Sequence, residues 1–396
     1  MGWLSGWAKR RKITIDHGKI DNDLTDFPIL IYLSSNSGIN NTDVTSIFDE
    51  VGSNRKKIAV TTSDGETQCY VEIEKWDAVN EEAWLWVKVP NISATEDTIL
   101  YIYYDNTQPD NTDYVGDPGE TPAQQVWSNG FVAVYHLNRD PSGTAPQEID
   151  STGNGHDGTS QGSMTSDDLV SGKINDALDF DGSDDMITIP DDPALESFSQ
   201  ATLEAWIKMD INSRDQFFLC KQAAHKLSGT YKILFDYSAY QSGRSKVISI
   251  WGNNVRVEGL TENLAIGTWY YVVGWTYGST TKIFLNGVED GSASGNAFYQ
   301  VDSETVKIGG GESGSYFDGI IDEVRISNAA RSTAWIKATY ETNRDNLLTW
   351  GSEQTAAAWR KLQYYTEPPS AGWNKLKYAT EPPVAGAWNK LLYEGE

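Results

Sequence analysis

Residues 316–336 read Y-F-D-G-I-I-D-E-V-R-I-S-N-A-A-R-S-T-A-W-I, and this stretch carries three structural signals in succession. Asp318 and Gly319 form an acidic turn, and the apolar residues that follow alternate with polar ones as in a half-buried strand. Ser332 is a suitable N-cap for a short helix, which we expect over residues 331–340. The stretch therefore predicts a turn, a strand and a helix in that order.

Other segments with turn and strand character precede this stretch. In chain order they are D-S-T-G-N-G-H-D-G from Asp150, A-L-D-F-D-G-S-D-D from Ala177, T-L-E-A-W-I-K from Thr202, G-T-W-Y-Y-V-V from Gly267 and K-I-F-L-N-G-V from Lys282. Together with residues 316–336 they resemble the laminin-G-like jelly roll, part of the concanavalin A-like lectin and glucanase superfamily. The resemblance implies a binding or structural module more readily than an enzyme.

The first part of the chain has the pattern of an all-β domain. Period-two or continuous apolar runs, separated by polar turns, occur at 12–16, 27–33, 57–61, 69–73, 83–89 and 98–104. In the run A-W-L-W-V-K-V, Trp84, Trp86 and Lys88 share one face and the other apolar residues share the opposite face. We therefore expect one core face and one aromatic face.

Two segments of this part carry a second resemblance. W-A-K-R-R-K-I-T-I-D, from Trp7, and L-T-D-F-P-I-L-I, from Leu24, resemble a domain-of-unknown-function family often found immediately before laminin-G-like modules. The resemblance covers residues 3–115. It implies a β-sandwich of prokaryotic and phage surface proteins and no catalytic residues.

A stretch rich in proline and glycine separates the two parts. Residues 106–124 read N-T-Q-P-D-N-T-D-Y-V-G-D-P-G-E-T-P-A-Q, a composition that disfavours a helix or an interior strand. Strand patterns resume at residue 131 and continue to residue 326 with turn signals between them. We predict an all-β protein of two antiparallel β-sandwich (jelly-roll) domains with a short Trp/Pro repeat tail. The predicted units are a first sandwich over 1–106, a linker over 107–125, a jelly roll over 126–353 and the tail over 354–396.

Charge and composition exclude several classes. Asp and Glu outnumber Lys and Arg by 56 to 31, and a net charge of -25 repels a phosphate backbone, so we expect no nucleic-acid partner. The start M-G-W-L-S-G-W-A-K-R-R-K-I-T-I lacks the apolar region of a signal peptide, and no apolar run is long enough to insert in a membrane. Cys69 and Cys220 lie in different predicted domains and are expected to be buried free thiols.

The basic run from Lys9 to Lys12 is the one reversal of this charge. We interpret it as an exposed edge strand, in which charges block mispairing. Pairing with an acidic neighbouring subunit is the alternative.

Asp150, Asn154 and Asp322 are the predicted metal ligands. The laminin-G-like resemblance implies a cation where the D-S-T-G-N-G loop meets the turn before the I-D-E strand, and these are the matching positions. Carboxylates beside backbone carbonyls suit Ca²⁺, which is the predicted cofactor. The alternative is that Asp150 and Asn154 cap a turn while Asp322 accepts hydrogen bonds from backbone amides. The D-F-D-G-S-D-D segment lacks the spaced ligands of a helix-loop-helix calcium loop, and we interpret it as a tight turn.

Aromatic residues are candidates for glycan binding, because their flat faces and polar edges suit sugar rings. Most of the 15 Trp and 20 Tyr residues must belong to the cores. The four near loops that we predict to bind glycan are Tyr240, Trp251, Tyr299 and Tyr316.

No catalytic site is predicted. The glucanase branch of the superfamily carries E-x-D-x-x-E on one strand, and that motif is absent. The adjacent acids Asp322 and Glu323 should point to opposite faces of a strand. No histidine lies in the Ser or Cys context of a nucleophilic triad, and His136 is interpreted as a satisfied residue of the sandwich.

The last part of the chain is a short repeat. The units W-R-K-L-Q-Y, W-N-K-L-K-Y and W-N-K-L-L-Y recur, and T-E-P-P follows the first two. Each unit has too little apolar area for a core of its own, so we predict a tail that docks on another surface during assembly, or else an extension packed on its own chain. The residues expected to dock are Trp359, Leu362, Tyr364, Trp373, Leu376, Tyr378, Trp388, Leu391 and Tyr393.

These inferences predict a structural and adhesive virion protein of a phage-like particle, as a head decoration, fibre or tail component, with a lectin-like module for surface glycans. Expected partners are other virion proteins, further copies of the chain, such as a trimer, and host-surface glycans. The expected location is the virion, extracellular after lysis. The alternative is a secreted or cell-surface carbohydrate-binding protein of a prokaryote, and a third class is a glycoside hydrolase with an unusual site.

Overall fold

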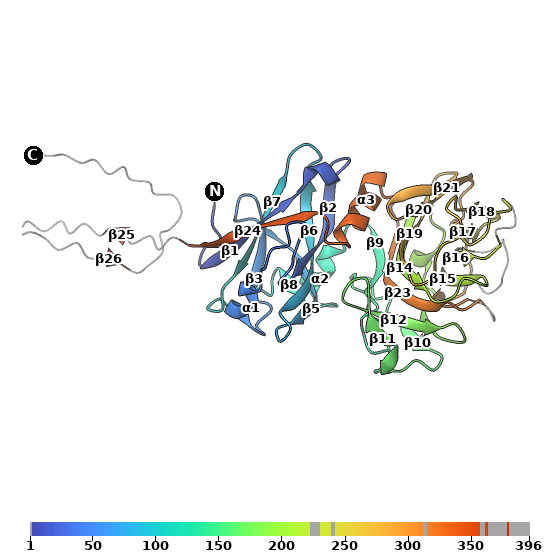
Figure 1. Cartoon of the computed structure of the whole chain (residues 1–396), viewed down its shortest axis with the longest axis horizontal. Helices are drawn as coiled ribbons and strands as arrows, with labels where there is room; N and C mark the ends of the chain where they lie inside the picture. Colours follow the sequence, from blue (N-terminus) through green and yellow to red (C-terminus); the bar gives the residue numbers. More distant parts are fainter. Residues whose placement is uncertain are drawn as a thin grey trace, which may run out of the picture.

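The computed structural model describes residues 2–221, 230–238, 242–311 and 315–356, together with the backbone of two short strands at 361–362 and 378–379. Over these residues the chain is all-β and forms two sandwiches that lie side by side (Figure 1). The predicted fold class is therefore confirmed.

In the described residues the first sandwich packs a five-stranded sheet against a four-stranded sheet. The first sheet has the order β24 (Leu348–Thr355), β1 (Lys9–Ile15), β7 (Thr98–Tyr104), β3 (Ile58–Thr62) and β4 (Gln68–Cys69). The second has the order β2 (Leu24–Leu33), β6 (Glu82–Ile92), β5 (Val71–Asp77) and β8 (Val115–Gly116). Leu85 and Val87 of β6 face the core, as the alternation predicts, and α1 (Ser46–Val51) packs Ile47 and Phe48 into the same core.

The last strand of the first sandwich comes from the far end of the described chain. β24 pairs with β1 in an antiparallel register that sets Trp350 opposite Ile13, and Leu347, Leu348 and Trp350 join the core of the first sandwich. The prediction placed residues 348–353 in the jelly roll, and the structure corrects that boundary. A strand pattern shows that a segment is a strand, but it does not show which sheet the strand joins.

The same strand changes the interpretation of the basic run. β1 lies between β24 and β7, so the prediction of an exposed edge strand is wrong. Arg10 is only 5% exposed, and its guanidinium lies 3.8 Å from the centroid of the Tyr101 ring. It also donates a 2.8 Å hydrogen bond to Gln354 of β24 and a 2.7 Å bond to the hydroxyl of Tyr103. The guanidinium of Arg10 is therefore stabilised by aromatic rings and hydrogen-bond acceptors, and it does not protect an exposed strand edge from mispairing.

The predicted linker contains regular structure. β8 adds to β5 as a parallel edge strand, and α2 (Thr121–Val126) follows it. Pro122 lies in the first turn of α2, where the missing N–H removes no hydrogen bond, and the helix buries Ala123 and Val126. The prediction that this segment forms no helix is therefore wrong, because Pro122 is tolerated in the first turn of α2.

In its described residues the jelly roll consists of two large sheets. One has the order β10 (Thr159–Gln161), β13 (Met186–Ile189), β22 (Val306–Ile308), β15 (Gln216–Cys220), β16 (Lys232–Asp236), β17 (Val247–Gly252) and β18 (Val255–Glu258). The other has the order β11 (Leu169–Ser171), β12 (Asp176–Asp181), β23 (Asp318–Ser327), β14 (Gln200–Met209), β19 (Trp269–Tyr277), β20 (Thr280–Leu285) and β21 (Val288–Ser294), with β9 (Phe131–Tyr135) paired to β23.

The predicted helix after β23 is present as α3 (Thr333–Thr342) and lies between the two sandwiches (Figure 1). The Ser332 side chain accepts a 3.1 Å hydrogen bond from the backbone N–H of Trp335, which confirms the predicted cap. The Trp335 ring packs edge-on against Phe27 of β2 with centroids 4.8 Å apart. α3 therefore leads the chain from the jelly roll back to the first sandwich, where β24 begins.

The remaining elements are short. Single 3₁₀ turns occur at η1 (His17–Lys19), η2 (Ser166–Asp168) and η3 (Pro193–Leu195). None of the helices in the described segments is both long and apolar enough to cross a membrane.

Two short strands fall in the predicted tail. β25 (Lys361–Leu362) and β26 (Tyr378–Ala379) pair with each other and set Leu362 opposite Tyr378. The other predicted docking residues lie outside the described residues: Trp359, Tyr364, Trp373, Leu376, Trp388, Leu391 and Tyr393.

Ending the chain after residue 346 should severely destabilise the first sandwich. The change removes β24, takes Leu347, Leu348 and Trp350 out of the core and leaves the backbone groups of β1 without partners on one side. Because loss of one large core side chain alone costs about 3–5 kcal/mol, we expect the free energy of unfolding in urea to fall by at least about 3 kcal/mol. A chain that ends after residue 356 keeps β24 and is the control. Equal stability of the two shortened chains would contradict this role of β24.

Candidate functional site at the domain junction

The aromatic face of β6 is the surface on which the jelly roll packs. Trp86 is fully buried there, and its indole N–H donates a 2.8 Å hydrogen bond to Glu74 of β5. The guanidinium of Arg325, from β23 of the jelly roll, lies 4.4 Å from the centroid of the Trp86 ring. Trp127, the residue after α2, packs against Trp86 with ring centroids 5.4 Å apart. Aromatic rings from the first sandwich thus cover a cation from the second.

A β-bulge in β23 places the side chains of Asp322 and Glu323 at this junction. Ile321 and Val324 both belong to the jelly-roll core, and two residues, Asp322 and Glu323, stand between them where a regular strand has room for one. Glu323 has a positive φ of 52°, as the first residue of such a bulge can have. The prediction that Asp322 and Glu323 point to opposite faces is therefore wrong, because the bulge breaks the alternation.

His136, just after β9, is surrounded by three carboxylates. Its Nδ1 lies 2.6 Å from Oε1 of Glu323 and 3.5 Å from Oε2 of Glu74, and its Nε2 lies 3.3 Å from Oε2 of Glu72. Arg325 donates a hydrogen bond to the other oxygen of Glu323. We call Glu72, Glu74, His136, Glu323 and Arg325 the junction cluster. The prediction that His136 is a satisfied residue of the sandwich is confirmed, and its partners come from both sandwiches.

Burial shifts the protonation of the cluster. Desolvation raises the pKa of Glu74 to about 7, because the side chain is removed from water. Burial alone would lower the pKa of His136, but the carboxylates of Glu323, Glu74 and Glu72 hold it well above its usual value. Burial likewise opposes ionisation of Glu323, whereas His136 and Arg325 together bring its pKa below the usual value. The cluster is therefore a mutually compensated set of buried charges.

A cleft of about 650 Å³ opens beside the cluster, between the two sandwiches. Lys75 of β5 and Asp176 of β12 form a 2.7 Å ion pair across it, and Arg55 binds Asp117 through two hydrogen bonds of 2.8 and 2.7 Å. Its other polar and aromatic lining residues include Glu74, Trp76, Asp77, Asn138, Arg139 and Asn175. We call this the junction cleft.

The predicted calcium ligands are all engaged in hydrogen bonds. Asp150 is 1% exposed and accepts from the backbone N–H groups of Val134, Thr152 and His156, as well as from the Thr152 hydroxyl. Asn154 donates to the carbonyl of Val132 at 2.9 Å. These bonds are those expected of residues that organise a turn.

Asp322 accepts hydrogen bonds from the backbone N–H groups of Lys173 and Ile174 at 2.7 and 2.9 Å. These hydrogen bonds are those expected if Asp322 binds backbone amides, which is the alternative to a Ca²⁺ site. Ca²⁺ binding at Asp150, Asn154 and Asp322 stays a prediction.

The predicted glycan-binding aromatics do not line the junction cleft. Trp251 is 6% exposed and packs against Phe217 and Leu234, whereas Tyr299 is 56% exposed. Tyr316 is half-buried and bridges to Phe217, and Tyr240 lies outside the described residues. Of the three described positions, Tyr299 is the most exposed.

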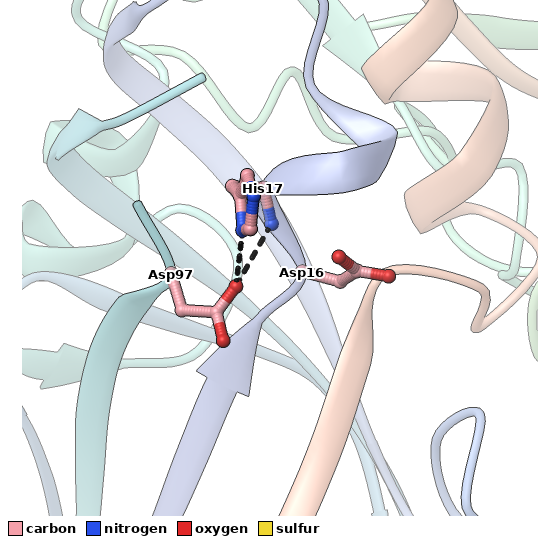
Figure 2. A group of neighbouring side chains, drawn as sticks. All are labelled: Asp16, His17 and Asp97. Atoms are coloured by element: carbon pink, nitrogen blue, oxygen red, sulfur yellow. Dashed lines mark hydrogen bonds and ion pairs between the residues drawn. The ribbon is translucent and has the colours of Figure 1, made fainter. Parts of the chain in front are cut away.

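Groups of His, Asp or Glu with ligand atoms within 4.8 Å of one another occur at three places in the described residues. One, Asp181, Asp184 and Asp185, lies in the D-F-D-G-S-D-D turn, where Asp181 accepts from the backbone N–H of Ser183, as predicted for a tight turn. The second is exposed: His17 contacts Asp97 at 2.7 Å, while the Asp16 side chain turns away from the pair (Figure 2). The third, Glu74, His136 and Glu323, belongs to the junction cluster.

Sequence reasoning missed the acidic half of the cluster. Glu72 and Glu74 alternate in V-E-I-E on β5, and this period-two pattern was the available signal that two carboxylates share a face. The signal could not show that the face is buried, because the covering surface belongs to another domain.

The fold and the junction define an all-β protein in which a jelly roll is joined to a second sandwich through buried charge. Both modules are identified by family comparison: residues 181–337 match the concanavalin A-like lectin/glucanases superfamily, and residues 54–131 match a domain of unknown function (DUF2341). The two resemblances seen in the sequence are thereby confirmed. A comparison with curated proteins finds no match.

Several solved structures match part of this chain. Domain 4 of AbnA, a GH43 extracellular arabinanase from Geobacillus stearothermophilus in complex with arabinotriose, is 21% identical with a TM-score of 0.42, over 52% of this chain and 96% of that one. The binding domain of Paraclostridial Mosquitocidal Protein 1 is 10% identical (TM-score 0.41, over 54% and 52%). The receptor binding domain of the botulinum neurotoxin C/D mosaic serotype is 13% identical (TM-score 0.41, over 55% and 55%). The matched part is about half the length of each toxin domain, and likenesses at this level carry no information on what this chain binds.

Replacing Arg325 by Met should destabilise the protein by about 3–5 kcal/mol, because Glu323 would remain buried without its cation. The free energy of unfolding, measured by urea titration, checks this expectation. Lys282→Met removes one partner of the more exposed Lys282–Glu289 pair, where we expect a change of at most about 1 kcal/mol. Similar effects of the two substitutions would show that the buried pair is not a special source of stability.

Proposed function

We propose that this chain is a non-catalytic, adhesive binding protein that holds a carbohydrate in the junction cleft. The observation that carries the proposal is the combination of one partly exposed indole with several planar polar groups around a single concave space. Such a combination suits sugars, whose C–H faces pack on aromatic rings while their hydroxyls exchange hydrogen bonds with amides, carboxylates and guanidinium groups.

Trp76 supplies the aromatic surface. Its indole N–H donates a 2.8 Å hydrogen bond to the carbonyl of Gly52, and its ring packs against Phe48 with centroids 4.7 Å apart. These contacts fix the plane of the ring before any ligand arrives. A fixed ring loses little conformational entropy on binding, which favours affinity.

Polar groups with spare capacity lie around the same space. The Oδ1 atom of Asn175 is buried and has no hydrogen-bond partner among the described residues, so it can accept from a sugar hydroxyl. Arg139 is exposed on the lining and offers further donors. The cleft therefore presents both an acceptor and donors to a ligand on the indole ring.

The carboxylates of the cleft support a non-catalytic role. Glycoside hydrolysis in the usual two-carboxylate mechanism needs one acid and one free carboxylate across the sugar. Asp117 and Asp176 are held in ion pairs by Arg55 and Lys75, and both oxygens of Glu74 accept hydrogen bonds from Trp86 and Asn138. These partners leave no pair of carboxylates free for the reaction in the described part of the cleft.

We further propose that the adhesive module works on a phage-like particle, as a head decoration, fibre or tail component, with residues 354–396 as the anchoring segment. The position of β24 supports this arrangement, because the strand runs away from the jelly roll toward the far end of the first sandwich (Figure 1). A partner bound beyond residue 356 would leave the junction cleft accessible. A secreted or cell-surface carbohydrate-binding protein is the alternative setting.

Replacing Trp76 by Ala should lower the affinity for the best oligosaccharide found on a glycan array by at least about tenfold, because the stacking surface is lost. Titration calorimetry with that oligosaccharide measures the change. Tyr299→Ala removes an exposed aromatic outside the cleft and should leave the affinity unchanged. The reverse result would move the site to Tyr299, and no binding across the array, or release of reducing sugar, would overturn the proposal.

Antibody against residues 354–396, applied to native source particles, should label the particles in electron micrographs if this segment belongs to an assembled virion protein. Permeabilised particles should label more strongly than intact ones if the segment is buried at an attachment point. Label on cells with bare particles would instead support the cell-surface alternative.

A further inference from the structure

The side chains of Glu74, His136 and Glu323 bring three possible metal-ligand atoms close together. A single nitrogen, His136 Nδ1, faces carboxylate oxygens of both Glu323 and Glu74, at 2.6 and 3.5 Å. One N–H can make one short hydrogen bond here, and the 3.5 Å contact is longer than a good hydrogen bond. A cation at this position would attract both carboxylates.

From this geometry we propose that Glu74, His136 and Glu323 bind one divalent first-row transition-metal ion at the floor of the junction cleft. Their ligand atoms all lie within 4.8 Å of one another. The contacts of 2.6 and 3.5 Å bracket the distance of about 3.4 Å that separates two ligands of a tetrahedral ion with bonds of about 2.0–2.1 Å. Ion binding at this position would move Nδ1 of His136 and Oε1 of Glu323 apart by about 0.8 Å.

The His136 ring has a carboxylate at its second nitrogen, as metal-bound histidines commonly do. The second nitrogen of His136 faces Glu72 at 3.3 Å, and Glu72 in turn accepts a hydrogen bond from the indole N–H of Trp127. A metal-bound imidazole commonly donates its other N–H to a carboxylate in this way, which fixes the ring and its tautomer.

The two carboxylate ligands are also oriented by neighbours. Trp86 donates to Glu74 at 2.8 Å, and Arg325 donates to the oxygen of Glu323 that does not face His136. Arg325 thus holds Glu323 from behind, whereas Trp86 donates to Oε2 of Glu74, the same oxygen that faces His136 Nδ1.

The cluster has acceptor capacity that the described residues do not use. Glu72 is 0% exposed, and its Oε1 atom has no hydrogen-bond partner among the described residues. A buried carboxylate oxygen without a partner is costly, and a cation or a metal-bound water nearby would relieve that cost. This oxygen belongs to the carboxylate that faces Nε2, across the imidazole ring from the proposed ion, so it indicates a missing donor behind the His136 ligand.

The ligand atoms restrict which metal ions can bind, and the junction cleft is the route by which an ion would enter. One imidazole nitrogen with carboxylate oxygens suits Zn²⁺, Mn²⁺ or Fe²⁺, whereas Ca²⁺ prefers six to eight oxygen ligands. Glu74 and Asn138 line the junction cleft, so the route from solvent to the buried His136 and Glu323 passes these two side chains. Three protein ligands leave a coordination position for water on the cleft side.

The test uses the full chain, treated with chelator and titrated with Co²⁺ and Zn²⁺ near pH 7. We expect Co²⁺ to bind with a stoichiometry of one and to give visible d–d absorption, and Zn²⁺ to displace it. His136→Gln should abolish this binding, and Glu72→Gln should weaken it by about 10–100-fold because the imidazole loses its supporting carboxylate. His17→Gln, in the exposed group of Figure 2, is the matched control and should leave the Co²⁺ spectrum unchanged.

The outcomes separate a metal site from a purely charge-compensated cluster. A folded wild-type chain that shows no saturable Co²⁺ or Zn²⁺ binding overturns the proposal, as does binding that survives His136→Gln or is lost in His17→Gln. Circular dichroism establishes that each variant is folded. If His136→Gln does not fold, the wild-type titration together with Glu72→Gln still decides the question.

Discussion

Buried charges at the junction constrain the position of the two sandwiches relative to each other. Glu72 and Glu74 belong to the first sandwich, while Glu323 and Arg325 belong to the second, and His136 lies among the carboxylates of both. Removing one partner from such a set leaves an uncompensated charge away from water, which costs several kcal/mol. The sandwiches therefore have one well-compensated arrangement, and the shape of the junction cleft follows from it.

The route of the chain reinforces this arrangement. After α2 the chain builds the jelly roll, returns through α3 and only then adds β24 to the first sandwich. The first sandwich can be completed only when residues far apart in sequence have met, which is a slow type of contact to form. In return, the jelly roll is connected to the first sandwich at both ends, and the core of the first sandwich includes Phe131, Ile174 and Trp335 from beyond α2.

A rigid junction lowers the entropic cost of binding a ligand in the cleft. Trp76, Asn138 and Asn175 come from different sandwiches, and a flexible junction would have to order them each time a ligand bound. A junction fixed by buried charge removes that entropic cost in advance. The same fixed geometry keeps Glu74, His136 and Glu323 within reach of a single ion.

Much of the fold was predictable because the relevant signals are local. The alternation in A-W-L-W-V-K-V identified β6 and its aromatic face, and Ser332 identified the start of α3. The segment Tyr316 to Ile336 contains a strand and a helix as predicted, although Asp318 and Gly319, predicted to form a turn, belong to the strand. The candidate site was less predictable, because no local pattern shows that β5, which carries Glu74 and Trp76, faces another domain.

The sequence by itself determined the strands and the helix cap, since each depends on residues close together in the chain, and its composition and motifs indicated the acidic net charge and the two modules. Only the tertiary structure decided that β24 completes the first sandwich, that a bulge turns Asp322 and Glu323 to one side, and that three carboxylates surround His136. These features depend on which surfaces meet. The energy of a buried charge or a strand edge is set by groups from distant parts of the chain, so no local pattern contains it.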